Sequence, residues 1–287
     1  MTIKSNRTMR STLNYFYDKL AGIYSRNEIQ SICFLVMQSI CNCTKASLYA
    51  AEAVQLTDEQ QKRLDSLMER LQNKEPIQYI IGSCQFFDIH LNVNRSVLIP
   101  RPETEELVEW ILKDNLNKEG SLFDICTGSG CIAITIKKYK PTFIVSALDL
   151  SEEAIATAQG NAEKNGYEIR FITDDILAPK NLSDEKYDII VSNPPYVKEE
   201  EKTYMDENVL NFEPHMALFV PDENPLLFYE AIGRFGLSHL NTGGKLYFEI
   251  NEALGHETVT LLEKQGYQEV TLKKDIFGKD RMVRALL

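Results

Sequence analysis

One tetrapeptide, residues 193–196, combines a side-chain amide, two prolines and an aromatic ring. Its members are Asn193, Pro194, Pro195 and Tyr196. The Asn193 amide offers an acceptor oxygen and two donor hydrogens, and the Pro194 carbonyl offers a second acceptor. The prolines fix the backbone angle φ and lack N–H groups, which leaves a rigid edge rich in acceptors. We expect this edge to hold a planar –NH₂ group by both of its hydrogens, against the ring of Tyr196.

Such an edge suits a particular kind of reaction. Amide and exocyclic amino nitrogens are poor nucleophiles, because their lone pair is delocalised into a π system. Two acceptors that hold both N–H bonds turn the lone pair toward an electrophilic methyl group, so that positioning carries much of the rate. The same acceptors stabilise positive charge that develops on nitrogen, and the methylated nitrogen becomes acidic enough to lose its proton without a strong base. The tetrapeptide therefore predicts methyl transfer rather than hydride transfer or an ordinary proline-rich turn.

A second segment, residues 124–130 (Asp-Ile-Cys-Thr-Gly-Ser-Gly), lies between a predicted strand and a predicted helix. Its glycines let backbone N–H groups approach a ligand closely at a helix N-terminus. Residues 128–133 also fit a G-x-G-x-x-A dinucleotide pattern, and Asp149 lies about where a ribose-binding acid is expected. An acid in residues 173–176 can accept from an adenine amino group. The loop predicts an adenosine cofactor, but by itself it does not separate NAD from S-adenosylmethionine (SAM).

Strand-like apolar runs alternate with helical stretches from Ser121 onward, which predicts an α/β fold with a doubly wound parallel sheet. The predicted strands are Leu122–Ile125, Phe143–Leu148, Arg170–Ile172, Tyr187–Val191 and Lys245–Ile250. Ligands of open α/β sheets bind beyond the carboxyl ends of the strands. The glycine loop after the first strand and the tetrapeptide after the fourth are therefore expected to face one crevice.

The first quarter of the chain has helical periodicity. Apolar residues recur at helical spacing within 29–40 and 64–71, and Thr57 begins a capping-box pattern before the second stretch. Two apolar runs, Gln78–Gly82 and Phe86–Val93, predict the strands of a hairpin. Thr104 is expected to cap the helix that follows. The predicted parts are a helical domain at 1–73, a β-hairpin linker at 74–100 and a catalytic domain at 101–287.

Several segments together resemble the release-factor glutamine methyltransferases (PrmC/HemK). Besides the tetrapeptide, they are residues 75–82, 98–105, 212–214 with 217–218, and 278–281. The resemblance covers essentially the whole chain, and it implies a SAM-dependent class I methyltransferase with a Rossmann-like sheet whose last strand is antiparallel. The implied reaction transfers a methyl group from SAM to the side-chain nitrogen (N5) of the glutamine in the Gly-Gly-Gln motif of bacterial class 1 peptide chain release factors.

The resemblance also implies roles for individual residues. Asn193, Pro194 and Tyr196 are expected to be catalytic, and with Pro195 they bind the substrate amide. The expected cofactor-binding residues are Cys126, Thr127, Gly128, Ser129, Gly130, Asp149, Asp175, Ile176 and Asn193. Arg101 and Glu103 are expected to help close the pocket. Cys126 stands where many methyltransferases have glycine, so a side chain occupies a position at which the backbone approaches the ligand.

The net charge is −11, with 31 basic and 42 acidic residues, and the acidity is uneven. Residues 1–73 contain nine basic and seven acidic residues, whereas 74–287 contain 22 and 35. An adenine-amino methyltransferase on DNA or RNA is the main alternative, since the tetrapeptide would serve it equally well, but it needs a basic track for phosphates. The charge instead favours a basic protein partner steered to the catalytic part, and no nucleic-acid substrate is expected.

Two further classes fit the sequence less well. A SAM sensor without activity has no use for an amide clamp, and a dehydrogenase lacks a histidine beside the loop or the tetrapeptide. The six cysteines match no zinc pattern, so no metal is expected. Neither a secretory signal nor a membrane-spanning run is visible. The sequence therefore predicts a cytoplasmic enzyme that does not bind a membrane.

Overall fold

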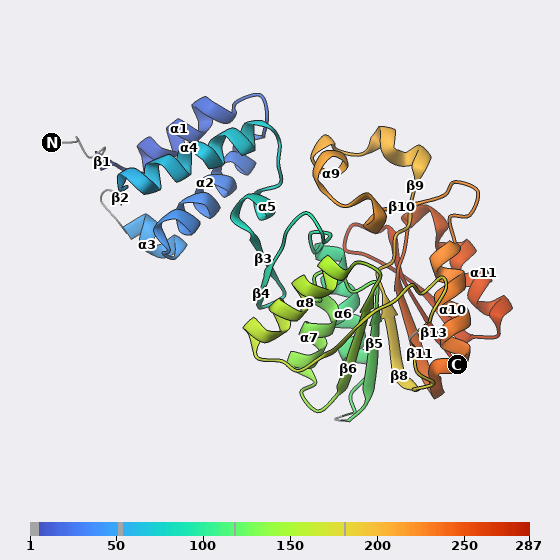
Figure 1. Cartoon of the computed structure of the whole chain (residues 1–287). Coiled ribbons are helices and arrows are strands. Elements are labelled where there is room, and N and C mark those ends of the chain that lie inside the picture. Colours follow the sequence, from blue (N-terminus) through green and yellow to red (C-terminus); the bar gives the residue numbers. More distant parts are fainter. Residues whose placement is uncertain (1–5, 51–53, 118, 181) are drawn as a thin grey trace. The chain divides into compact units, whose positions relative to one another are not determined.

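The computed structural model describes residues 6–50, 54–117, 119–180 and 182–287, and internal contacts divide the chain into two units (Figure 1). The first unit contains Met1–Gly82 and Asp206–Phe212, and the second contains Ser83–Met205 and Glu213–Leu287. The predicted domain boundaries, at 73/74 and 100/101, remain an interpretation of the sequence. Residues 1–5 of the predicted helical domain lie outside the described part of the chain.

The first unit is a group of helices around one apolar cluster. Its elements are α1 (Met9–Leu20), α2 (Arg26–Cys41), α3 (Lys45–Ala50), α4 (Asp58–Gln72), α5 (Ile77–Ile81), α9 (Glu207–Phe212) and the strand pair β1 (Asn6–Arg7) with β2 (Val54–Gln55). The apolar stripes predicted within α2 and α4 are buried in this cluster. The predicted capping box at Thr57 is confirmed, because Gln60 N donates to Thr57 Oγ1 and Thr57 N donates to Gln60 Oε1.

The predicted hairpin lies further along the chain than its sequence pattern indicates. Residues Ile77–Ile81 form helix α5, and the hairpin strands are β3 (Ser83–Phe86) and β4 (Ile89–Asn92). Gly82 ends the helix with φ 76°, a left-handed conformation that glycine adopts without steric cost. The expectation of a strand at 78–82 is wrong, because the pattern of a short apolar run does not separate a buried helical turn from a strand.

The second unit is built on a seven-stranded sheet of order β12-β13-β11-β8-β5-β6-β7. The strands are β5 (Ser121–Ile125), β6 (Ile144–Asp149), β7 (Arg170–Thr173), β8 (Tyr187–Ser192), β11 (Leu240–Glu249), β12 (Gln268–Lys274) and β13 (Asp280–Leu286). Neighbours from β11 to β7 are parallel, and β13 is antiparallel to both β11 and β12. The expected doubly wound sheet with an antiparallel last strand is thus confirmed.

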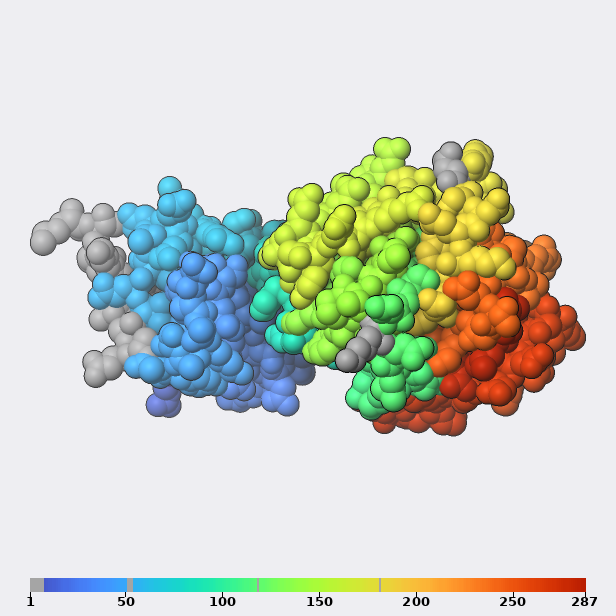
Figure 2. All heavy atoms as spheres, turned by 90° about the horizontal axis from the view of Figure 1, so that it is seen from below, coloured from blue at the N-terminus to red at the C-terminus, as the bar shows by residue number. Residues whose placement is uncertain are grey.

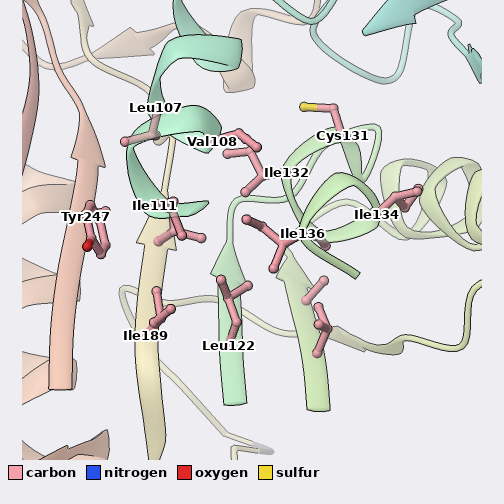
Figure 3. Packing of buried hydrophobic residues seen from close by; sticks show 14 of the residues in the cluster. Leu107, Val108, Ile111, Leu122, Cys131, Ile132, Ile134, Ile136, Ile189 and Tyr247 are labelled. Carbon is pink, nitrogen blue, oxygen red and sulfur yellow. The ribbon is translucent and has the colours of Figure 1, made fainter. Parts of the chain in front are cut away.

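Helices cover both faces of this sheet. They are α6 (Pro102–Asp114), α7 (Cys131–Tyr139), α8 (Glu152–Asn165), α10 (Leu227–His239) and α11 (Gly255–Gln265). Successive strand residues point to opposite faces, so Leu122 and Ile189 join the cluster with α6 and α7, whereas Phe123 and Ile190 join the cluster with α10 and α11. Figure 3 shows the first cluster, in which side chains of α6 and α7 pack over Leu122 and Ile189.

The segment after β8 contains short elements that lead into α10. They are β9 (Val197–Lys198), paired in parallel with β10 (Phe219–Val220), and the 3₁₀ turns at Glu199–Tyr204 and His215–Ala217; a third 3₁₀ turn, Glu252–Leu254, follows β11. In the second unit, the green and yellow segments and the orange and red segments form one continuous surface (Figure 2). Among the helices in the described ranges, none is long and apolar enough to cross a membrane.

Candidate active site

A cavity of the second unit lies at the carboxyl ends of β5, β6 and β8, with a volume of about 150 Å³. This is about ten times the ~10–15 Å³ that one buried water needs, so the cavity has room for an organic ligand. Apolar side chains such as Ile132, Leu148 and Phe228 form part of its wall. The predicted site residues that line it are Arg101, Cys126, Thr127, Gly128, Ser129, Asp149, Asp175, Ile176, Asn193 and Pro195.

Four predicted site residues lie beside this cavity rather than in its wall. Gly130 is the N-cap of α7 with φ 80°, and a Cβ there would come within 3.0 Å of Ile134. Pro194 is buried, and Glu103 lies in the first turn of α6. Tyr196 turns its hydroxyl toward Glu249. The individual roles of all these residues stay predictions.

The glycine loop is held against the end of β6 by main-chain donors. Thr127 N donates to the Leu148 carbonyl at 2.9 Å, and Gly128 N donates to Asp149 Oδ2 at 2.8 Å. Ser151 N donates to Asp149 Oδ1 at 3.0 Å. Burial raises the pKa of Asp149, and these backbone bonds oppose the rise. Each carboxylate oxygen keeps a second lone pair, so Asp149 can brace the loop and still accept from two ligand hydroxyls.

Cys126, the residue that departs from glycine, has φ 62°. This left-handed conformation costs a residue with a Cβ roughly 1–2 kcal/mol. Gly128 and Gly130 share it at φ 55° and 80°, so three of the five loop residues from 126 to 130 adopt the left-handed region. Burial and the nearby Asp149 carboxylate raise the pKa of the Cys126 thiol, which keeps it neutral. Cys126 thus has the left-handed backbone conformation that favours glycine, although it carries a side chain.

The two acids after β7, Asp174 and Asp175, differ in the hydrogen bonds that they accept. Asp174 is buried, and its carboxylate accepts from Asp175 N at 2.9 Å and Lys180 N at 2.9 Å. Asp175 lines the cavity and accepts from Leu177 N at 2.9 Å. Both acids therefore line the cavity, and Asp174 also fixes the turn through both of its carboxylate oxygens.

The tetrapeptide is connected to two side chains that are distant in sequence. Asn193 Nδ2 donates to Thr104 Oγ1 at 3.3 Å, and Thr104 Oγ1 donates to Glu249 Oε2 at 2.6 Å. Tyr196 donates its hydroxyl to Glu249 Oε1 at 3.2 Å. Thr104 is not the helix cap that we expected: α6 begins at Pro102, its N-cap Arg101 makes no side-chain cap bond, and Thr104 is inside the first turn. The Thr104 hydroxyl, which in a capping residue accepts from a main-chain N–H group, here donates to Glu249 and accepts from Asn193.

Glu249 is a buried carboxyl group at the end of β11, with 1% of its surface exposed. Burial raises its pKa, and the bond from Thr104 and the charge of Arg281 oppose this rise. Arg281 lies in segment 278–281, and it is fixed by Asp275 Oδ2 at 3.2 Å and Glu252 Oε2 at 3.1 Å. The C-terminal segment thus supplies a cation whose charge acts on the Glu249 carboxylate.

An ion pair connects residues of two further segments that carry the family resemblance, 98–105 and 212–214. Arg101 Nη2 donates to Glu213 Oε1 at 2.5 Å, and Ile99 N donates to Glu213 Oε2 at 3.2 Å. The Glu213 side chain is buried, and Arg101 also lines the cavity. Glu213 thus binds both Ile99 and Arg101 and connects residues 98–105 to the segment that begins at Glu213.

Sequence reasoning did not assign functions to Glu249 and Asn161. Asn161 is buried in α8, donates to the carbonyls of Ser129 at 3.0 Å and Asn92 at 2.9 Å, and accepts from Asn92 N at 2.6 Å. It thereby ties the glycine loop to hairpin strand β4. A polar residue on the apolar face of the helix, next to Ala158 and Ala162, was the available signal for Asn161. For Glu249 the signal was a lone acid at the end of an apolar strand.

The fold of the second unit is a methyltransferase fold. The family model "Methyltransferase small domain" matches residues 103–211, which contain the glycine loop and the tetrapeptide. The model "PrmC N-terminal domain" matches residues 11–82. The solved structure of a methyltransferase from Pyrococcus furiosus shares the fold, with a TM-score of 0.53 and 19% identity over 80% of this chain and 98% of that one.

Two relatives narrow the class. The release factor glutamine methyltransferase of Flavobacterium psychrophilum is 46% identical over 288 residues, which is 99% of both chains. That of Bacteroides thetaiotaomicron is 44% identical over 271 residues, 94% of this chain and 97% of the relative. The chain therefore belongs to the release factor glutamine methyltransferase family, and the resemblance noted in its motifs is confirmed.

Proposed function

We propose that this protein transfers the methyl group of SAM to the N5 nitrogen of the glutamine in the Gly-Gly-Gln motif of class 1 peptide chain release factors. The names of its relatives support a release factor as substrate and a glutamine as target. The proposal adds three parts that these names do not state: the Gly-Gly-Gln motif, class 1 of the release factors, and SAM as the cofactor.

One observation carries the assignment of the target group. In the part of the chain that the structure describes, no donor is bonded to Asn193 Oδ1 or to the Pro194 carbonyl, although Asn193 Nδ2 is taken up by Thr104. Asn193 lines the cavity and Pro194 is the next residue, so two adjacent acceptors without donors are available to match the two hydrogens of a primary amide. Leaving such acceptors unpaired is unfavourable once water is displaced, so a group with two N–H bonds is the partner that satisfies them.

The residues of the cavity fit SAM. Asp149 can accept from both ribose hydroxyls, Asp175 can accept from the adenine amino group, and Ile176 and Phe228 can cover the adenine ring. The left-handed residues of loop 126–130 would let its main-chain N–H groups hold the amino-acid end of the cofactor. When bound, SAM supplies a methyl group made electrophilic by its positively charged sulfur.

The protein's part in the reaction is positioning. Asn193 Oδ1 and the Pro194 carbonyl hold the two hydrogens of the glutamine amide and thereby aim the nitrogen lone pair at the methyl group. The same two dipoles stabilise positive charge on the nitrogen during transfer. The rigid prolines at 194 and 195 keep these dipoles from reorienting. The product nitrogen then releases a proton to solvent, so no strong base is needed.

The alternative, methylation of an adenine amino group, would use the same two acceptors. The names of the relatives favour the release factor, and so does the excess of acidic residues in 74–287. Three parallel incubations with methyl-labelled SAM separate the two: a release factor, its Gly-Gly-Gln variant with Gln→Ala, and duplex DNA. We expect label only on the unaltered release factor, as a mass increase of one methyl group on the peptide that contains the motif. Label on the variant protein or on DNA would overturn the proposal.

A further inference from the structure

Three parts of the chain meet directly behind the Asn193 amide. Thr104 comes from the first turn of α6, Glu249 from the end of β11, and Tyr196 from the tetrapeptide itself. Thr104 is 2% exposed and Glu249 is 1% exposed, so water does not compete for their polar atoms. The bonds between them are therefore set by the hydrogens that these side chains own.

Counting those hydrogens fixes the orientation of the amide. A hydroxyl group has one hydrogen, and an ionised carboxylate has none. The bond of 2.6 Å between Thr104 Oγ1 and Glu249 Oε2 uses the only hydrogen of Thr104. Thr104 can then only accept from Asn193, and the group that can donate is Nδ2, which lies 3.3 Å away. The Asn193 oxygen is left on the other side of the amide, where no described residue donates to it.

We propose that Thr104 and Glu249 are positioning residues that keep the Asn193 amide turned with Oδ1 toward the substrate nitrogen. The inference rests on the proposed function for the identity of that substrate, but the orientation of the amide does not depend on it. An amide turned by 180° would present its hydrogens to the hydrogens of the glutamine amide, and that complex could not form both bonds. Each carboxylate oxygen has its own task, because Oε1 accepts from Tyr196 while Oε2 accepts from Thr104.

The charge of Arg281 completes this arrangement. Its side chain is 14% exposed and held by Asp275 and Glu252, so it is a fixed cation whose charge acts on Glu249. Burial raises the pKa of Glu249, and the Thr104 bond, the Arg281 charge and the Tyr196 bond oppose this rise. The ionised form matters because it has no hydrogen of its own to donate to Thr104. This accounts for segment 278–281, which neither the cofactor nor the clamp otherwise requires.

The test uses a nearly isosteric pair at residue 104 in the full-length protein. Thr104→Val keeps the shape but removes the hydroxyl, and Thr104→Ser keeps the hydroxyl. We expect Thr104→Val to lower kcat toward a release factor by about 10–100-fold, as for a group that is present but misplaced. Affinity for SAM should change less than about twofold. Thr104→Ser should restore most of kcat, which a role in packing alone does not explain.

A matched control comes from Thr258, a buried threonine of α11 that does not line the cavity. Its hydroxyl donates to the Leu254 carbonyl at 2.8 Å, so Thr258→Val also removes one buried hydroxyl bond. We expect the two valine variants to lose similar thermal stability, whereas only Thr104→Val loses kcat. Equal kcat values for Thr104→Val and Thr258→Val would overturn the positioning role.

Glu249→Gln tests the other half of the pair. A glutamine can donate to Thr104, which frees the Thr104 hydroxyl to donate to Asn193 and favours the turned amide. We expect kcat to fall about as far as in Thr104→Val. Thermal stability should change little, because Arg281 keeps its ion pairs with Asp275 and Glu252 and is not left as an unpaired charge. Wild-type kcat in Glu249→Gln would contradict the proposal.

A readout without substrate separates this inference from the proposed function. The side-chain NH₂ resonances of Asn193, identified by their loss in Asn193→Ala, can be followed in protein labelled with ¹⁵N-asparagine. We expect them to shift in Thr104→Val and to return in Thr104→Ser. If the wild-type protein fails to methylate a release factor while these shifts are seen, the proposed function fails and the orientation stands. Unchanged resonances in Thr104→Val, beside an active wild-type enzyme, reject the orientation alone.

Discussion

The two sides of the cavity are built in different ways. On the glycine-loop side, the bonds join residues 127–128 to residues 148–149, and most of the donors are main-chain N–H groups. On the clamp side, Asn193 depends on Thr104, which is 89 residues away, and Thr104 depends on Glu249, which is 145 residues away. One side is made by the local path of the backbone, and the other is made by side chains that only the folded sheet brings together.

This difference determines how each side responds to substitution. A main-chain N–H group survives every replacement except proline, so the loop can lose one side chain and still bind part of its ligand. The clamp presents a single side-chain oxygen, and no neighbouring group can replace it. Catalysis should therefore be more sensitive to single substitutions than cofactor binding is.

The largest effect is expected for Asn193→Ala on the clamp side. Loss of one preorganised dipole at a reacting group costs about 10²–10³-fold in kcat, and we expect this variant to be at the upper end or inactive. Binding of SAM should remain largely intact. Steady-state methylation of a release factor and calorimetric titration with SAM measure the two effects separately, and wild-type turnover in the variant would refute the clamp.

On the loop side, Asp149→Ala should weaken SAM binding more than turnover, the reverse of what is expected for Asn193→Ala. The variant loses two acceptors for ribose hydroxyls and also the bonds that brace Gly128 and Ser151. At roughly 1 kcal/mol for each lost bond, affinity for SAM should fall by about 10–100-fold. Turnover at saturating SAM should fall less than in Asn193→Ala. Unchanged affinity by calorimetry would reject the ribose role and remove the contrast between the two sides.

The contrast also explains what could be predicted from the sequence. Strand and helix runs, the glycine loop and Asp149 follow from patterns within short windows, and so do the parallel sheet and the expectation that tetrapeptide and loop share a cavity. The antiparallel last strand came from the resemblance alone, although the five residues between Gln268–Lys274 and Asp280–Leu286 include Gly278 and are a hairpin signal that the strand predictions did not use.

What could not be predicted depends on long-range pairing. Thr104 has the type and place of a helix cap, and nothing near it in the sequence indicates that its partner is Glu249. The register of β8 against β11, which pairs Ser192 with Phe248, brings Asn193 and Glu249 to the same edge of the sheet. Such a register is decided by the packing of whole strands, so single-sequence patterns do not give it.

A smaller effect is expected for Asp124, which is buried at the end of β5 before the loop. Its Oδ2 accepts from Thr127 and Ala133 N, but no described residue bonds to Oδ1, and burial raises the pKa of Asp124 to about 7. Because the folded pKa lies above the unfolded value of 3.8, its stabilising contribution is complete below about pH 4 and is lost as the pH rises through about 7.

Asp124→Asn removes this titration while keeping the shape. We therefore expect the melting temperature of Asp124→Asn, relative to wild type, to increase as the pH is raised from about 4 to about 7 and to level off above that. Melting curves of both proteins across this range measure the difference. A difference that is independent of pH would mean that Asp124 stays charged in the fold.

The smallest effect concerns Cys126, where the loop carries a side chain in the left-handed region. Cys126→Ala keeps the Cβ and its backbone strain and loses the packing of the sulfur, whereas Cys126→Gly loses the packing but relieves the strain. Relief is worth roughly 1–2 kcal/mol, and the greater freedom of glycine in the unfolded chain offsets about half of it. We therefore expect Cys126→Gly to be more stable than Cys126→Ala by roughly 0.5–1 kcal/mol in urea denaturation.

Cys131 provides the matched position, because it is buried in the same unit but begins helix α7. A helical residue favours alanine over glycine by up to about 1 kcal/mol, so the order of the two variants should reverse there. If the alanine variant is more stable than the glycine variant at both positions, the left-handed backbone at Cys126 does not destabilise the protein as expected. In that case the glycine loop would require the Cys126 side chain, and the contrast with the clamp, which requires the Asn193 side chain, would disappear.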